Sequence, residues 1–126
     1  MLVALALLST LAQPPTARSV TLTLPHALRE GEVAFLAVTV GVIPRGAEIE
    51  ITTPTGRPLG TISPHGIRPG HEAGTYTVPL PANAISGRRV TVLLSLSANG
   101  KRRVPTKKEV KRVRVECLQR PSVKPI

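Results

Sequence analysis

Histidines in one proline- and glycine-rich stretch are the first residues in this sequence that could bind a metal. His65 and His71 lie six residues apart, Glu72 follows them, and His26 could join them in the folded chain. A structural zinc site needs four closely spaced ligands, and a blue-copper site needs a cysteine followed by histidine and methionine. The sequence supplies neither set. We therefore expect surface histidines, no metal site and no cofactor.

Nucleophilic catalysis is the second chemistry to consider, because Ser63-Pro64-His65 places a hydroxyl near an imidazole. The chain contains no aspartate, so only a glutamate could orient the histidine, and no Gly-x-Ser-x-Gly elbow is present. The single cysteine, Cys117, cannot form a disulfide within the chain, and its alternating neighbours indicate a buried small residue. We expect no catalytic residue and a protein that is not an enzyme.

Positive charge is concentrated near the carboxyl terminus. The chain carries 17 Lys or Arg and 7 acidic residues, a net charge of +10. From Lys101 onward there are ten basic and two acidic residues, a net of +8, whereas the first hundred residues have a net of +2. Such charge attracts phosphate or carboxylate groups. The candidate residues for one cationic, anion-binding face are Lys101, Arg102, Arg103, Lys107, Lys108, Lys111, Arg112 and Arg114.

The alternative is that these charges only solubilise the surface and protect an edge strand from aggregation. Aromatic residues are limited to one Phe and one Tyr, with no Trp. Because bases of single-stranded nucleic acids stack on aromatic side chains, sequence-specific nucleic-acid recognition is disfavoured. We expect the partner to be a protein or an anionic polymer of the cell envelope. Peripheral membrane contact stays open, and the sequence does not determine the oligomeric state.

The amino terminus is apolar from Met1 to Ala12 and uncharged until Arg18. Twelve residues are too few to span a bilayer as a helix, which needs ~20, but they suit the apolar region of a secretory signal. No Lys or Arg precedes the run. The sequence predicts a signal peptide over 1–12, with a cut after Ala17 as the alternative, and a periplasmic or secreted protein. A retained, folded segment in an intracellular protein is the competing interpretation.

The remaining chain shows short runs rich in Val, Leu, Ile and Thr, separated by turn residues. With 13 Pro and 10 Gly, long helices are disfavoured. Asn99-Gly100 is a strong hairpin signal because both residues tolerate positive φ. Alternating apolar and polar residues, and over 32–40 a denser apolar run, predict strands over 19–24, 32–40, 47–53, 59–62, 75–80, 89–98 and 101–104.

Two interpretations compete for residues 106–118. Thr106 and Glu109 have the spacing of a capping box, and apolar residues follow at helical spacing, which would give a basic amphipathic helix. Val113, Val115 and Cys117 also alternate with charged residues, which favours a final strand. We favour the strand, entered through a helical turn at 106–109.

The pattern resembles bacterial exported immunoglobulin-like and fibronectin-type modules. The resemblance is carried by 49–56, a strand running into a Pro/Gly hairpin, and by 73–78, where a lone Tyr follows Gly at a strand start. It covers roughly 19–117 and implies an all-β, antiparallel immunoglobulin/fibronectin-like β-sandwich of about seven strands. A small β-barrel with a C-terminal basic helix is the alternative fold.

The chain is expected to form one domain over 18–117 with a flexible basic tail over 118–126. Three hypotheses for its function are then open. The favoured hypothesis is an exported, non-catalytic interaction module of the cell envelope that contacts an anionic partner through its basic C-terminal strands. The alternatives are a basic β-barrel that binds nucleic-acid backbones and a subunit of a larger surface assembly.

Overall fold

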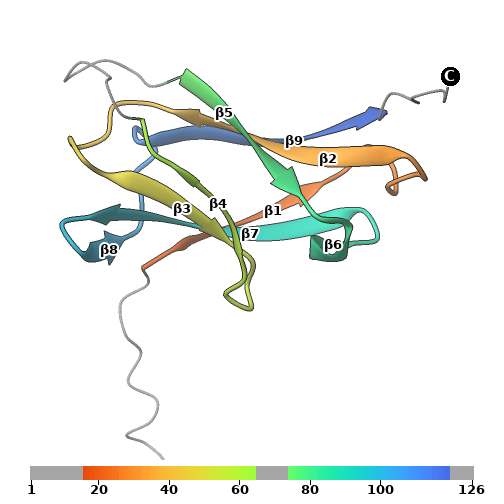
Figure 1. Ribbon diagram of the computed structural model, residues 1–126, viewed down its shortest axis with the longest axis horizontal. Coiled ribbons are helices and arrows are strands. Elements are labelled where there is room, and N and C mark those ends of the chain that lie inside the picture. Colours follow the sequence, from red (N-terminus) through yellow and green to blue (C-terminus); the bar gives the residue numbers. More distant parts are fainter. Residues whose placement is uncertain (1–15, 65–73, 120–126) are drawn as a thin grey trace, which may run out of the picture.

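The protein is a β-sandwich of two antiparallel sheets, shown in Figure 1 as an upper and a lower layer. The computed structural model describes residues 16–64 and 74–119. The first sheet has the order β1-β7-β3-β4, and β6 and β8 also pair with β7. Its strands are β1 (Arg18–Thr23), β3 (Glu48–Thr52), β4 (Pro58–Ile62), β6 (Ile85–Ser86), β7 (Arg89–Ala98) and β8 (Lys101–Arg103).

The long strand β7 organises the first sheet because it is paired along both edges. One edge carries β1 from Arg89 to Leu94 and then β8 from Leu96 to Ala98. The opposite edge carries β6 and then β3. The short hairpin strand β8 therefore lies at the C-terminal end of β7, beyond the start of β1.

The second sheet has the order β5-β2-β9, formed by β5 (Gly74–Leu80), β2 (Glu32–Val40) and β9 (Val110–Gln119). The most continuously apolar strand, β2, takes the central position, as its composition predicts. The register between β2 and β9 shifts at Thr39/Val40, where Lys111 is the extra residue of a bulge.

The core between the sheets is built from aliphatic side chains. Alternate residues of β7 and β2 point inward and are fully or almost fully buried, and inward residues of β3 and β5 complete the core. Gly60 permits the close approach of β4 to the second sheet, since a Cβ there would lie 2.9 Å from Val78 Cγ1. The members from these strands are Ala34, Leu36, Val38, Val40, Ile49, Ile51, Val78, Leu80, Val90, Val92, Leu94 and Leu96.

The strand order retains the central pairings of an immunoglobulin sandwich and exchanges its outer strands. Numbering the seven longest strands A to G in chain order, β2 pairs with β5 as B with E, and β3 pairs with β7 as C with F. The constant-type order places the first strand beside the second and the last beside the sixth. Here β1 lies beside β7, and β9 lies beside β2.

Most expected strands form with small changes at their ends. Residues 32–40 and 89–98 match without change, and the predicted hairpin forms with φ of 53° at Asn99 and 77° at Gly100. The 3-10 turn at Ala82–Ala84 and the two-residue strand β6 were not predicted, and both lie in an expected connection. Both are too short to produce a periodic pattern.

Residues 106–118, which could have formed a helix or a strand, form a turn followed by a strand. Residues 107–109 form the turn and β9 begins at Val110, so the helix alternative is wrong, as is the closed barrel. Pairing with β2 explains this outcome, because Val113, Val115 and Cys117 face the core when the segment is extended. Leu118 and Gln119 belong to β9, which corrects the predicted start of the tail at 118.

Candidate anion-binding site

Three connections meet at one end of the sandwich, at the left in Figure 1: the β2–β3 turn, the β7–β8 hairpin and the β8–β9 crossover. Glu48 at the start of β3 pairs with Ser97, and Ala98 at the end of β7 pairs with Lys101 across the hairpin. The amide of Gly41 donates to the carbonyl oxygen of Glu109 at 2.9 Å, which joins the β2–β3 turn to the β8–β9 crossover. We call this the cationic end and define it by its exposed cations Arg45, Lys101, Lys107 and Lys108.

An ion pair holds the crossover between the sheets. Arg103 on β8 donates from Nη1 and Nη2 to the two carboxylate oxygens of Glu109, each at 2.7 Å. The Glu109 pKa lies below its ordinary value, chiefly because of the Arg103 hydrogen bonds, with burial acting in the opposite direction. The Arg103 pKa is raised, first by the same hydrogen bond. Arg103 therefore stabilises the fold, and Glu109 neutralises its charge.

The turn that carries two of the lysines is fixed by reciprocal hydrogen bonds. The Thr106 amide donates to Glu109 Oε1 at 2.9 Å, and the Glu109 amide donates to Thr106 Oγ1 at 3.2 Å. This is the capping box expected from the sequence, although one helical turn rather than a helix follows it. Lys107 and Lys108 lie inside this turn with exposed side chains.

Gly41 makes room for this turn. A Cβ at Gly41 would lie 2.1 Å from the carbonyl oxygen of Lys108 and 3.0 Å from Cε of Lys111. Because the nearest atom belongs to the backbone, no side-chain movement can relieve the clash. The position of Lys107 and Lys108 thus depends on a glycine about 65 residues earlier in the sequence.

The carboxylates near the cationic end already contact other side chains of the protein. Glu50 forms an ion pair with Arg102 on the outer face of the first sheet, with Arg102 Nε 2.8 Å from Glu50 Oε2. Glu48 accepts a hydrogen bond from the Ser63 hydroxyl. Within 16–64 and 74–119, no ion pair involves the four exposed cations Arg45, Lys101, Lys107 and Lys108.

The eight predicted cations do not share one face, which corrects that expectation. Arg112 and Arg114 alternate with the inward residues of β9 and project from the outer face of the second sheet, opposite Thr39 and Ala37. Arg114 lies 3.5 Å from Glu116 Oε1. Arg102 projects from the first sheet instead. The separation arises because β8 and β9 belong to different sheets, whose outer faces point to opposite sides of the sandwich.

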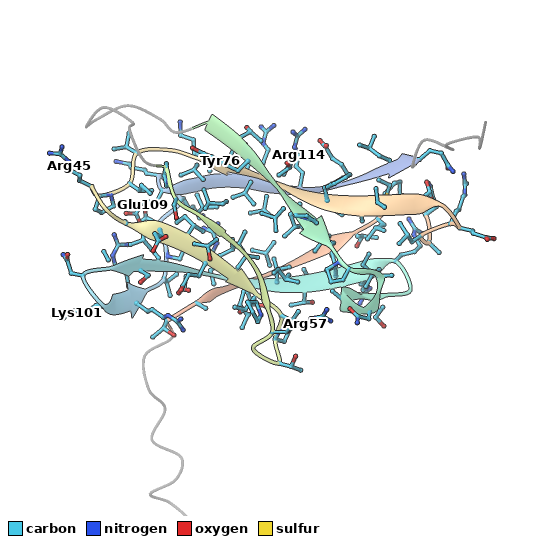
Figure 2. All side chains as sticks on the ribbon, viewed as in Figure 1. Arg45, Arg57, Tyr76, Lys101, Glu109 and Arg114 are labelled. Atoms are coloured by element: carbon cyan, nitrogen blue, oxygen red, sulfur yellow. The ribbon has the colours of Figure 1, made fainter. Side chains whose placement is uncertain are left out.

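Arg45 belongs to the cationic end and was missed by the sequence analysis. Figure 2 shows Arg45 and Lys101 at the same end of the molecule, while Arg57 lies away from it. The turn at 41–46 could be predicted from its glycines. Its proximity to the hairpin depends on the pairing of β3 with β7, for which the sequence carries no direct signal.

The other candidate groups are not assembled into a site in the described residues. His26 donates from Nδ1 to the Ala27 carbonyl at 2.9 Å, and its Nε2 lies 3.6 Å from Glu32 Oε2. His65, His71 and Glu72 lie outside the described residues. No group of three or more metal-ligating side chains occurs in 16–64 and 74–119. Burial, with a contribution from the Glu32 charge, raises the pKa of the Cys117 thiol.

Comparisons with known proteins identify no relative: no family model matches the chain, and no curated protein or solved structure matches it either. In the part of the chain that the structure describes, no helix has the length and hydropathy needed to cross a membrane.

Proposed function

We propose that the protein is an exported β-sandwich interaction module that binds an anionic polymer of the cell envelope through its cationic end. The proposal depends on one observation. Arg45, Lys101, Lys107 and Lys108 are exposed on adjoining connections, and the acids beside them are occupied by Arg102, Arg103 and Ser63.

The kind of cation indicates the kind of partner. Three of the four residues are lysines, whose flexible ammonium groups act as point charges, whereas arginine suits planar two-pronged recognition of one carboxylate or phosphate. Several flexible charges on one rigid end fit a repeating polyanion better than one small ligand. Binding of this kind releases counterions and weakens as salt is added.

The backbone beneath these charges is held in place before any partner arrives. The turn at 106–109 is fixed through Thr106, Glu109 and Arg103, and the β7–β8 hairpin has the dihedral angles that Asn99-Gly100 favours. Preorganisation lowers the entropy cost of binding. Only the side chains of Arg45 and the lysines must lose freedom when the polymer docks.

Two triple charge reversals test the proposal. The first is K101E/K107E/K108E at the cationic end. The second, R29E/R57E/R89E, changes the net charge by the same amount with exposed residues toward the opposite end. Affinity for polyphosphate and for polyglutamate is measured by fluorescence anisotropy at fixed salt. We expect roughly a hundredfold loss for the first variant and less than about threefold for the second. Equal losses would show that only net charge matters and would refute the site.

Export is tested separately, by mass spectrometry of the protein isolated from its native cells. Because the apolar run ends at Ala12, the proposal predicts an envelope or secreted protein that begins at Gln13, or at Arg18 for the alternative cut. An intact Met1 in a cytosolic fraction would overturn export without affecting the binding site.

A further inference from the structure

The free edge of β9 differs from the other free edges of the sandwich. An edge strand exposes unpaired N–H and C=O groups, and proteins protect such edges with proline, short length, bulges or charged side chains. β5 contains Pro79, β4 begins with Pro58, and β1 has six residues. β9 has ten residues, contains no proline, and carries its bulge only at its start, at Lys111. It is the longest edge in the described chain without proline, and its remaining protection is the row of charged side chains on its outer face.

The side chains along β9 form two alternating rows. Arg112, Arg114 and Glu116 are exposed on the outer face of the second sheet, followed by Leu118, which is 56% exposed. Val113, Val115 and Cys117 face the core and are half-buried. A strand pairing with this edge must keep the two rows in phase, because a slip of one residue turns every side chain to the wrong face.

Two copies of β9 can pair in an antiparallel arrangement that keeps the two rows in phase. In one such register, charged side chains of each copy face oppositely charged side chains of the other. With the twofold axis at Val115, each Arg114 lies opposite the Glu116 of the second copy, and each Arg112 lies opposite Leu118. Moving the axis to Arg114 or to Glu116 places identical charges opposite each other. Moving it to Val113 places Arg112 opposite Arg114. Opposite charges directly across an antiparallel pair are favourable, and like charges are unfavourable.

We propose that the protein forms a twofold-symmetric homodimer in which β9 pairs with β9 of a second copy, centred on Val115. The two three-stranded sheets then form one continuous six-stranded sheet. The pairing spans 111–119 and stops before Val110, whose carbonyl oxygen accepts a hydrogen bond from Arg18 at 3.4 Å. It leaves the cationic end of each copy exposed, so the dimer is independent of the proposed anion binding and doubles the number of sites.

Charge swapping tests the register. E116R places Arg114 opposite an arginine in the second copy, and R114E places Glu116 opposite a glutamate. Either change should weaken the dimer by at least about tenfold in sedimentation velocity. The double variant R114E/E116R restores both opposite-charge pairs and should restore the dimer. Circular dichroism confirms that each variant is folded.

Cysteine cross-linking tests the same register without charge changes. In the proposed dimer Cys117 lies opposite Val113 of the second copy, four residues from the other Cys117. Under a thiol oxidant the wild type should stay uncross-linked. The variant V113C should form a disulfide-linked dimer between the introduced thiol of one copy and Cys117 of the other. T77C, which places a thiol on the outer face of β5, is the control and should not cross-link.

Three results would overturn the proposal. The first is a wild-type protein that remains monomeric at millimolar concentration. The second is a dimer unaffected by E116R. The third is a wild-type dimer that cross-links through Cys117 to Cys117, since this requires an axis at Cys117 instead of Val115.

Discussion

Both ends of this sandwich carry several cations, and they use them differently. At the end opposite the cationic end, Arg88 donates from Nε and Nη2 to the Leu24 carbonyl oxygen at 3.1 and 3.0 Å, and from Nη2 to the Pro25 carbonyl oxygen at 3.0 Å. Arg57 donates to Asn83 Oδ1 at 2.7 Å. These arginines tie connections to each other. At the cationic end Arg103 has that role, and Arg18 donates to the Val110 carbonyl oxygen, whereas Arg45, Lys101, Lys107 and Lys108 form no ion pair within the described residues.

The comparison shows that the number of cations does not identify a candidate binding site. An arginine that already donates two or three hydrogen bonds to the protein loses them when it turns to a ligand, which costs roughly 1–3 kcal/mol. An exposed lysine has no such bonds to lose. Residues that stabilise the fold and residues available to a partner should therefore separate in mutational experiments.

The largest effect on stability is expected from Gly41→Ala, because the new Cβ meets the Lys108 carbonyl oxygen. Either the turn at 106–109 moves or the backbone at Gly41 does, at a cost of about 2–3 kcal/mol. Urea unfolding measures the loss. Gly46→Ala is the control, since its φ of +79° makes alanine costly by about 1 kcal/mol but its surroundings are open. A smaller loss for Gly41→Ala than for Gly46→Ala would contradict the close approach.

Glu109→Gln should reduce stability at neutral pH by about 1–2 kcal/mol, because it removes the charge that Arg103 and Thr106 contact. The folded-state pKa of Glu109 is lowered. Its contribution is therefore present above the unfolded-state pKa, about 4.3, and is lost as the pH falls through the lower folded-state value.

Thermal unfolding from pH 7 to pH 2.5 checks this dependence on pH. The difference between wild type and Glu109→Gln should shrink as the pH falls. A difference that stays constant across the range would show that the Glu109 charge does not stabilise the crossover.

Arg88→Ala should cost about 1 kcal/mol, because Arg88 is exposed and its truncation lets water reach the carbonyl oxygens of Leu24 and Pro25 that it contacted. Affinity for polyphosphate should fall by less than about threefold. Thermal unfolding measures the loss of stability, and fluorescence anisotropy measures the loss of affinity for polyphosphate. A large loss of affinity without a loss of stability would make this end the binding site.

The smallest effect on stability is expected from the double change K107A/K108A, within about 0.5 kcal/mol, because both side chains are exposed and form no ion pair in the described chain. The same variant should lose roughly tenfold in affinity for polyphosphate. If stability falls as much as in Glu109→Gln, the lysines stabilise the fold, and the cationic end does not differ from the opposite end in how it uses its cations.

Local periodicity was sufficient to predict most of the fold. A dense apolar run marked β2 and alternation marked β7, both to the residue, and Asn99-Gly100 marked the hairpin. The pairing partners were beyond sequence reasoning, because the exchange of β1 and β9 between the sheets depends on long-range packing. The local pattern of a strand is the same whichever neighbour it takes.

The candidate site was predicted only in part for the same reason. The basic segment was visible as composition, and the reciprocal bonding of Thr106 and Glu109 was visible as spacing. The structure adds Arg45 to the cationic end, assigns Arg103 to Glu109, and directs Arg112 and Arg114 outward from the second sheet. Each of these differences from the prediction results from a contact in the folded protein, and the sequence does not identify which residues make that contact.

Titration of the isotope-labelled protein with polyphosphate, followed through its amide resonances by NMR, shows whether one end of the sandwich binds polyanions. We expect shifts to concentrate in residues 41–46, 99–103 and 106–111, and residues 24–31, 53–57 and 81–88 to stay unchanged. Shifts of equal size at both ends, or shifts confined to the outer face of β9, would contradict this expectation.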